Sequence, residues 1–122
     1  MGLTNLSGAN LSLANLSDAD LSYAILLNAY LGDAHLGGAN LSYADLSSAD
    51  LRRSYVVEAN LNKANLIGAY LSGAIGLTDE QMTSAWSLEG ATMPNGQKYE
   101  ERLKSKGRGS ERSAALRNPA LR

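Results

Sequence analysis

A leucine recurs at every fifth position between residues 6 and 71, and Val56 fills the one gap in the series. A small residue stands two positions before each of them, and it is alanine everywhere except at Thr4 and Ser54. Asparagine or aspartate usually lies between the small residue and the leucine. The repeating unit is therefore A-(N/D)-L-x-x, and it occurs fourteen times between about residue 4 and residue 73.

A period of five fits neither regular element. On an α-helix each step of five residues turns the side chain by about 140°, so the leucines would be spread around the axis and form no stripe. On a continuous strand five is an odd number, so successive leucines would alternate between the two faces. If every leucine belongs to a core, the chain must turn once per pentad. This pattern predicts a β-solenoid with short straight sides and corners.

A longer periodicity indicates how many pentads close one coil. The sequence LSYA occurs at 21–24 and again at 41–44, and AYL occurs at 29–31 and at 69–71. The first two copies are four pentads apart and the second two are eight pentads apart. These separations favour four pentads per coil, because positions four pentads apart would then stack in one column.

The run of ANL, ADL and AYL units resembles the pentapeptide repeat proteins. This resemblance covers about 70 of the 122 residues. It implies an all-β fold, a right-handed quadrilateral parallel β-helix in which leucine and alanine point inward and the other three positions face solvent. The segment 76–96 is similar to a C-terminal extension of cyanobacterial members.

A short helical cap is expected after the last repeat. Thr78 and Gln81 have the spacing of a capping box, with acidic residues in the first helical turn. A helix over about 79–87 would place Met82, Ala85 and Trp86 on one face. We expect Met82 and Trp86 to cover the last leucine layer.

Three segments follow from these patterns: a repeat β-helix over 1–75, a helix-and-turn cap over 76–96, and a charged tail over 97–122. Residues 1–96 carry nine acidic and three basic side chains, a net charge of −6, whereas residues 97–122 carry eight basic and three acidic ones, a net charge of +5. The polar, glycine-containing tail is interpreted as a flexible extension. It could also contact acidic lipid or nucleic acid, or fold back on the acidic rod.

The N-terminal end shows no such cap, because the repeats begin within five residues of Met1. Either the first coil is left bare, or it pairs with a second copy of the chain in a homodimer.

Stacking of successive coils predicts columns of exposed side chains. Tyr23 and Tyr43 share one column, and Tyr30 and Tyr70 share another. Packing between coils is the simpler interpretation of these tyrosines, and a binding platform is the alternative. Ile25, Leu27 and Ile67 form a small apolar group that could contact a partner, although scattered surface aliphatic residues are common.

Catalytic chemistry is not expected. The chain has no cysteine and one histidine, His35, whose predicted neighbours are Asn15 and Tyr55 and include no nucleophile. We therefore expect no enzyme activity, no cofactor and no metal site. No stretch approaches 18 consecutive apolar residues and no secretory signal is visible, which favours a cytoplasmic protein without a membrane span.

Two functions compete. The first is a structural or protein-interaction module with an unknown protein partner. The second is a DNA mimic that inhibits DNA gyrase, as some pentapeptide repeat proteins do, and the acidic rod is compatible with it. The chain has no phenylalanine and carries basic residues at 52, 53 and 63, which departs from such mimics. Direct binding of nucleic acid is not expected.

Overall fold

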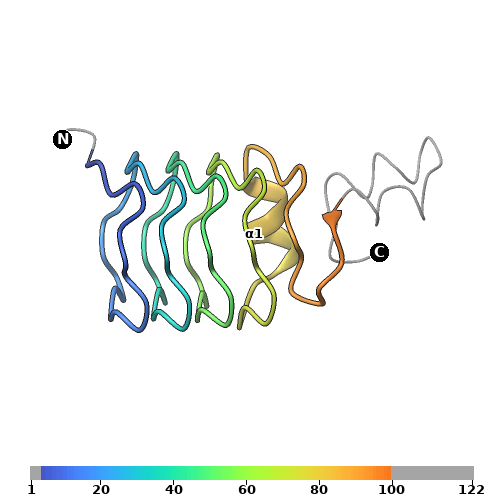
Figure 1. The fold of residues 1–122 in the computed structure, drawn as a ribbon, viewed down its shortest axis with the longest axis horizontal. Helices are drawn as coiled ribbons and strands as arrows, with labels where there is room; N and C mark the ends of the chain where they lie inside the picture. Colours follow the sequence, from blue (N-terminus) through green and yellow to red (C-terminus); the bar gives the residue numbers. More distant parts are fainter. Residues whose placement is uncertain (1–3, 100–122) are drawn as a thin grey trace.

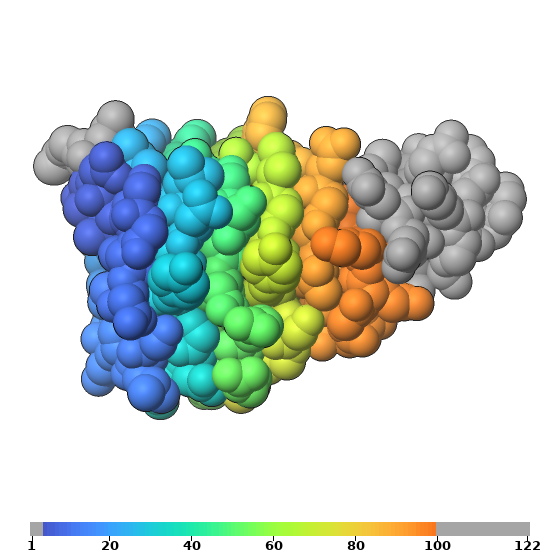
Figure 2. All heavy atoms as spheres, in the orientation of Figure 1, coloured from blue at the N-terminus to red at the C-terminus, as the bar shows by residue number. Residues whose placement is uncertain are grey.

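The computed structural model describes residues 4–99. These residues form a rod of stacked coils, with the first repeat coil at one end and a single helix near the other (Figure 1). In Figure 2 the coils appear as successive bands that pack directly against one another.

Each coil consists of four pentads. Parallel bridges join positions that are four pentads apart, from Asn5 with Ile25 to Tyr55 with Ile75, as the sequence separations predict. The straight sides are very short, and each contributes a single bridging residue. Residues 4–99 accordingly contain no strand of more than one residue, and the ladder of bridges runs along the rod from coil to coil.

We number the four sides by their bridging columns. The first side carries Asn5, Ile25, Asp45 and Asn65, and the second carries Asn10, Tyr30, Asp50 and Tyr70. The third side carries Asn15, His35, Tyr55 and Ile75, and the fourth carries Asp20, Asn40 and Asn60.

The core consists of one leucine and one alanine per pentad. From Leu26 to Leu71 every leucine at the repeat position is at most 4% exposed, and Ser54, which replaces an alanine, is fully buried. The Ser54 hydroxyl donates to the carbonyl of Leu51 at 2.8 Å, so this buried polar group is satisfied. Between residues 4 and 23 the leucines at the repeat position are only partly buried, because no further coil among the described residues covers them. They are Leu6, Leu11, Leu16 and Leu21.

Helix α1 spans Asp79–Ser84 and begins with the predicted capping box. Gln81 donates its backbone N–H to the Thr78 hydroxyl oxygen, and its side-chain oxygen accepts from the Thr78 backbone N–H at 2.7 Å. The Gln81 amide nitrogen also donates to the carbonyls of Val56 and Ala59, at 2.8 and 3.0 Å. These bonds fix the helix to the last repeat coil, and Met82 is buried beneath it.

The expected role of Trp86 is wrong. The helix ends at Ser84, before the predicted end at residue 87, and Ala85 has an extended backbone. Trp86 donates its backbone N–H to the carbonyl of Ala64 at 2.8 Å, so the chain rejoins the ladder here. The Trp86 side chain is therefore outside the helix and 64% exposed.

The cap extends beyond the predicted boundary at residue 96. Lys98 forms an antiparallel bridge with Thr92, and Tyr99 is only 7% exposed. Leu88 and Met93 complete this last apolar layer, which the sequence did not reveal because it lies outside the repeat. The rest of the predicted tail, residues 100–122, lies outside the described residues.

Candidate functional site

The asparagine or aspartate of each pentad has a local structural role. At all nine positions where this residue precedes the leucine, its side-chain oxygen accepts from the backbone N–H two residues later, as at Asn5 and Asn40, both at 3.0 Å. Such an Asx bond holds the start of a turn. The repeat therefore uses these polar residues to hold its own corners.

Each corner also contains one residue with a left-handed backbone. The residue before the alanine has a positive φ in every pentad, and only Gly8, Gly38, Gly68 and Gly73 are glycine. The alanine N–H donates to the leucine carbonyl three residues earlier, as in Ala9 to Leu6 at 2.9 Å. A positive φ at the third residue is what a type II turn requires.

Tyr23 and Tyr43 form a stacked pair. Both occupy these left-handed corner positions, and their ring centroids lie 4.8 Å apart with an angle of 4° between the planes. This distance equals one spacing between adjacent coils. The two rings thus cover each other while their outer edges face solvent, with exposures of 53% and 48%.

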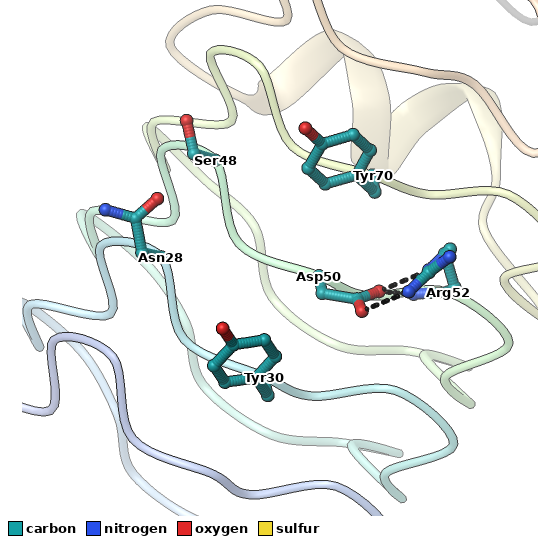
Figure 3. A pocket seen from close by; sticks show the side chains of 6 residues that line it. All are labelled: Asn28, Tyr30, Ser48, Asp50, Arg52 and Tyr70. Carbon is teal, nitrogen blue, oxygen red and sulfur yellow. Dashed lines mark hydrogen bonds and ion pairs between the residues drawn. The ribbon is translucent and has the colours of Figure 1, made fainter.

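Tyr30 and Tyr70 lie on the second side and are separated by one coil, which contributes Asp50 between them. Together with Asn28, Ser48 and Arg52 they line an open hollow of about 480 Å³. Figure 3 shows the two tyrosines on either side of the hollow, Asn28 and Ser48 at one end, and the Asp50–Arg52 pair at the other. The sequence placed these tyrosines in one column but did not reveal the hollow.

Two ion pairs lie at the corner between the second and third sides. Arg52 binds Asp50 through two hydrogen bonds of 2.9 and 2.8 Å, and Arg53 binds Asp33 in the preceding coil through bonds of 3.2 and 3.0 Å. The side-chain hydrogen bonds from these arginines lower the pKa of Asp50 and of Asp33. Both carboxylates are therefore ionised at neutral pH, and each is neutralised by its arginine.

The predicted interaction residues gather on two adjacent sides. Tyr23 lies at the corner before the first side, and the chain then passes Ile25 and Leu27 to reach Tyr30 on the second side. The equivalent residues of later coils stack on these four positions. Leu27 is 38% exposed, whereas Ile25 and Ile67 are half-buried. We call this region the tyrosine surface, and its residues are Tyr23, Tyr43, Ile25, Leu27, Ile67, Tyr30 and Tyr70.

The apolar part of the tyrosine surface is interrupted. Asp45 follows Ile25 in the next coil of the first side, and Ser47 lies between Leu27 and Ile67 in the stack. These aliphatic side chains therefore do not form one continuous patch.

Among residues 4–99, no group of three or more His, Asp or Glu side chains could hold a metal ion. His35 lies between Asn15 and Tyr55 on the third side, with its ring 6.2 Å from that of Tyr55. No helix within the described part of the chain is long and apolar enough to cross a membrane.

Comparison with known proteins identifies the repeat. A profile of pentapeptide repeats matches residues 3–38, 28–56 and 39–75, with eight copies. The chain belongs to the pentapeptide repeat family. No match is found among curated proteins.

Solved structures of pentapeptide repeat proteins are similar to this chain. Rfr23 from the cyanobacterium Cyanothece 51142 is 42% identical over 58% of this chain and 48% of its own, with a TM-score of 0.58. HetL from Nostoc sp. strain PCC 7120, which is involved in heterocyst differentiation regulation, is 38% identical over 77% of this chain and 46% of its own, with a TM-score of 0.43. The chain thus spans about half the length of either protein.

A weaker likeness exists to QnrB1, a plasmid-mediated fluoroquinolone resistance protein. It is 20% identical over 73% of this chain and 67% of its own, with a TM-score of 0.32. At that level of similarity it carries no argument about function.

Proposed function

We propose that this protein is a non-catalytic interaction module that binds a protein partner through the tyrosine surface. The observation that carries the proposal is the placement of its aromatic residues. Five of the six tyrosines and the single tryptophan are between 42% and 64% exposed. Exposed tyrosine and tryptophan side chains supply much of the energy of protein interfaces.

The distribution around the rod supports this proposal. Four of these aromatic residues lie on the tyrosine surface, whereas the bridging residues of the fourth side are Asp20, Asn40 and Asn60. The interior is filled with leucine and alanine, so a partner can only be met by the exterior. The right-handed sense of the coil and the cytoplasmic location remain predictions.

Affinity capture with matched variants tests the proposal. Tyr43→Ser combined with Tyr70→Ser removes two rings from the tyrosine surface, and Asn40→Ser combined with Asn60→Ser changes the fourth side at the same number of positions. A protein retained by the native chain and by the fourth-side variant, but lost with the tyrosine variant, supports the proposal. A partner lost only with the fourth-side variant contradicts it.

Inhibition of DNA gyrase is the alternative function. The acidic charge of residues 1–96 is compatible with a DNA mimic, but the ion pairs of Arg52 and Arg53 neutralise two of the carboxylates. A supercoiling assay separates the two functions. Inhibition by low-micromolar protein would replace the interaction module with the gyrase inhibitor as the favoured function.

Pairing of the first coil with a second copy of the chain also remains a proposal. The partly buried leucines of residues 4–23, such as Leu11 and Leu16, support it, because pairing would cover them. Light scattering during size-exclusion chromatography tests it. A mass that stays at 12.9 kDa at high protein concentration would contradict it.

A further inference from the structure

We propose that the hollow between Tyr30 and Tyr70 is a binding site for a neutral saccharide. It goes beyond protein binding, because it concerns a small ligand of a different chemical class.

The hollow exists because one coil carries a short side chain where its neighbours carry rings. Parallel bridges connect Tyr30 to Asp50 and Asp50 to Tyr70, so the two tyrosine backbones are two coil spacings apart, about 9.6 Å. A cyclic ligand above Asp50 would lie about 4.8 Å from each tyrosine position, the distance that Tyr23 and Tyr43 show for adjacent rings. One ring-sized ligand therefore fits the level that Asp50 leaves open.

The thickness of this space admits a saturated ring. A stacked aromatic ring would also fit at about 4.8 Å, as the Tyr23–Tyr43 pair shows, so the polar groups of the hollow decide between the two. A pyranose is puckered and projects C–H bonds from its faces, and it fills a wider space. Aromatic walls are suited to such C–H groups because the ring face is electron-rich.

The polar groups of the hollow match hydroxyl groups. Asp50 offers a hydrogen-bond acceptor and Arg52 offers donors at one end, and Asn28 and Ser48 offer both at the other. Among residues 4–99 no hydrogen bond engages the side chains of Asn28 and Ser48. A ligand with several hydroxyl groups can donate to and accept from both ends, because each hydroxyl does both.

The charge of the hollow favours a neutral ligand. Asp50 and Arg52 are joined by two hydrogen bonds and cancel each other, so neither a cation nor an anion is preferred locally. A ligand with a full charge would therefore lose hydration in the hollow without gaining net attraction. A polyhydroxylated neutral ring does not carry this cost.

Nuclear magnetic resonance titration of the full chain tests the site, with maltose and cellobiose as probes. We expect saturable shifts in the ring signals of Tyr30 and Tyr70, with a dissociation constant of about 1–10 mM, as suits an open hollow with few polar contacts. The ring signals of Tyr23 and Tyr43 should move little, because their pair already occupies its own level.

Three variants sharpen the test. Asp50→Tyr fills the hollow and Tyr70→Ala removes one wall, and each should weaken binding about tenfold or more. Tyr43→Ala removes an equally exposed tyrosine outside the hollow and should leave the affinity within about twofold. If Asp50→Tyr does not fold, Tyr70→Ala decides the result.

Two results would overturn the site. One is a folded native chain whose Tyr30 and Tyr70 signals do not respond to either disaccharide. The other is a stronger response to N-acetylarginine amide than to the sugars, which would make the hollow a cation site. Neither result would affect the capture experiment, because that experiment measures the retention of a protein partner and not the binding of a sugar.

Discussion

At the scale of single residues, the corners store backbone strain. Ten corner residues other than glycine have φ between 58° and 67°, a region that costs an ordinary L-residue about 1–2 kcal/mol. Asn28 and Asp33 tolerate it better than most, but Leu13, Arg53 and Lys63 do not. The sequence did not reveal this strain, because the corner position accepts almost any residue type.

Replacing Leu13 by glycine should raise the free energy of unfolding by about 0.5–1 kcal/mol. Leu13 has φ 67° and is 74% exposed, so its substitution relieves strain and loses little apolar burial. Urea denaturation measures the change. Ser12→Gly is the matched control in the same corner and should lower stability, since Ser12 has no positive φ to relieve. A stabilised control or a destabilised Leu13→Gly would contradict the argument.

The assignment of inward and outward positions predicts that two neighbouring substitutions, Ala39→Leu and Asn40→Lys, differ in their effect on stability. Ala39 is fully buried, so Ala39→Leu should overpack the core and cost about 3 kcal/mol or more. Asn40→Lys should cost about 1 kcal/mol, because the Asn40 oxygen accepts from both the N–H and the hydroxyl of Ser42. Thermal melting ranks the two variants. An Asn40→Lys variant that melts below Ala39→Leu would reverse the assignment of the positions.

At the scale of elements, the sequence predicted where α1 begins but not where it ends. The beginning is set locally by Thr78 and Gln81, and such capping pairs can be recognised in a sequence. The end is set by distant partners, because Ser84 accepts from the Lys63 N–H and Trp86 donates to Ala64. Helical periodicity cannot anticipate contacts with the preceding coil, which is why Trp86 was misplaced.

The substitution Gln81→Glu should lower the free energy of unfolding by about 2–3 kcal/mol at neutral pH. Glutamate still accepts from Thr78, but it cannot donate to the carbonyls of Val56 and Ala59 and would repel them. Denaturation by urea is the measurement, with Glu80→Gln on the exposed part of the same turn as the control. Equal losses in both variants would show that the amide does not fix the helix to the coil.

At the scale of the whole molecule, the pentad pattern was sufficient to predict the coil. The inward leucines, the coil of four pentads and the tyrosine columns all follow from the pentad and from its fourfold multiple. The hollow was not predicted, because it depends on how far Tyr30 and Tyr70 extend beyond Asp50 and on where Arg52 turns. The last apolar layer was missed because Met93 and Tyr99 have no repeat position.

The carboxylates along the rod should make it less stable in acid. Hydrogen bonds from Ser22, Arg53 and Arg52 lower the pKa of Asp20, Asp33 and Asp50 respectively. A carboxyl group whose pKa is lowered by folding contributes its full stabilisation of the folded state above its unfolded-state pKa, about 3.9. It loses this stabilisation as the pH falls through its folded-state pKa.

The urea midpoint should therefore change little between about pH 7 and pH 5 through these groups and fall below about pH 4. Asp33→Asn is the control. Its urea midpoint should decrease less on acidification, because one of the three carboxyl groups with a lowered pKa has been removed. A urea midpoint that rises as the pH is lowered from 5 to 3 would contradict the stabilising role of these carboxylates.

The coil of four pentads has a consequence for insertions and deletions. Adding or removing one pentad would rotate everything beyond it by a quarter turn, so Tyr70 would move to a neighbouring side and lose its alignment with Tyr30. Adding four pentads would lengthen the rod and keep every later residue on its own side. In this protein, genetic changes by whole coils preserve the surface, while changes by single pentads preserve only the core.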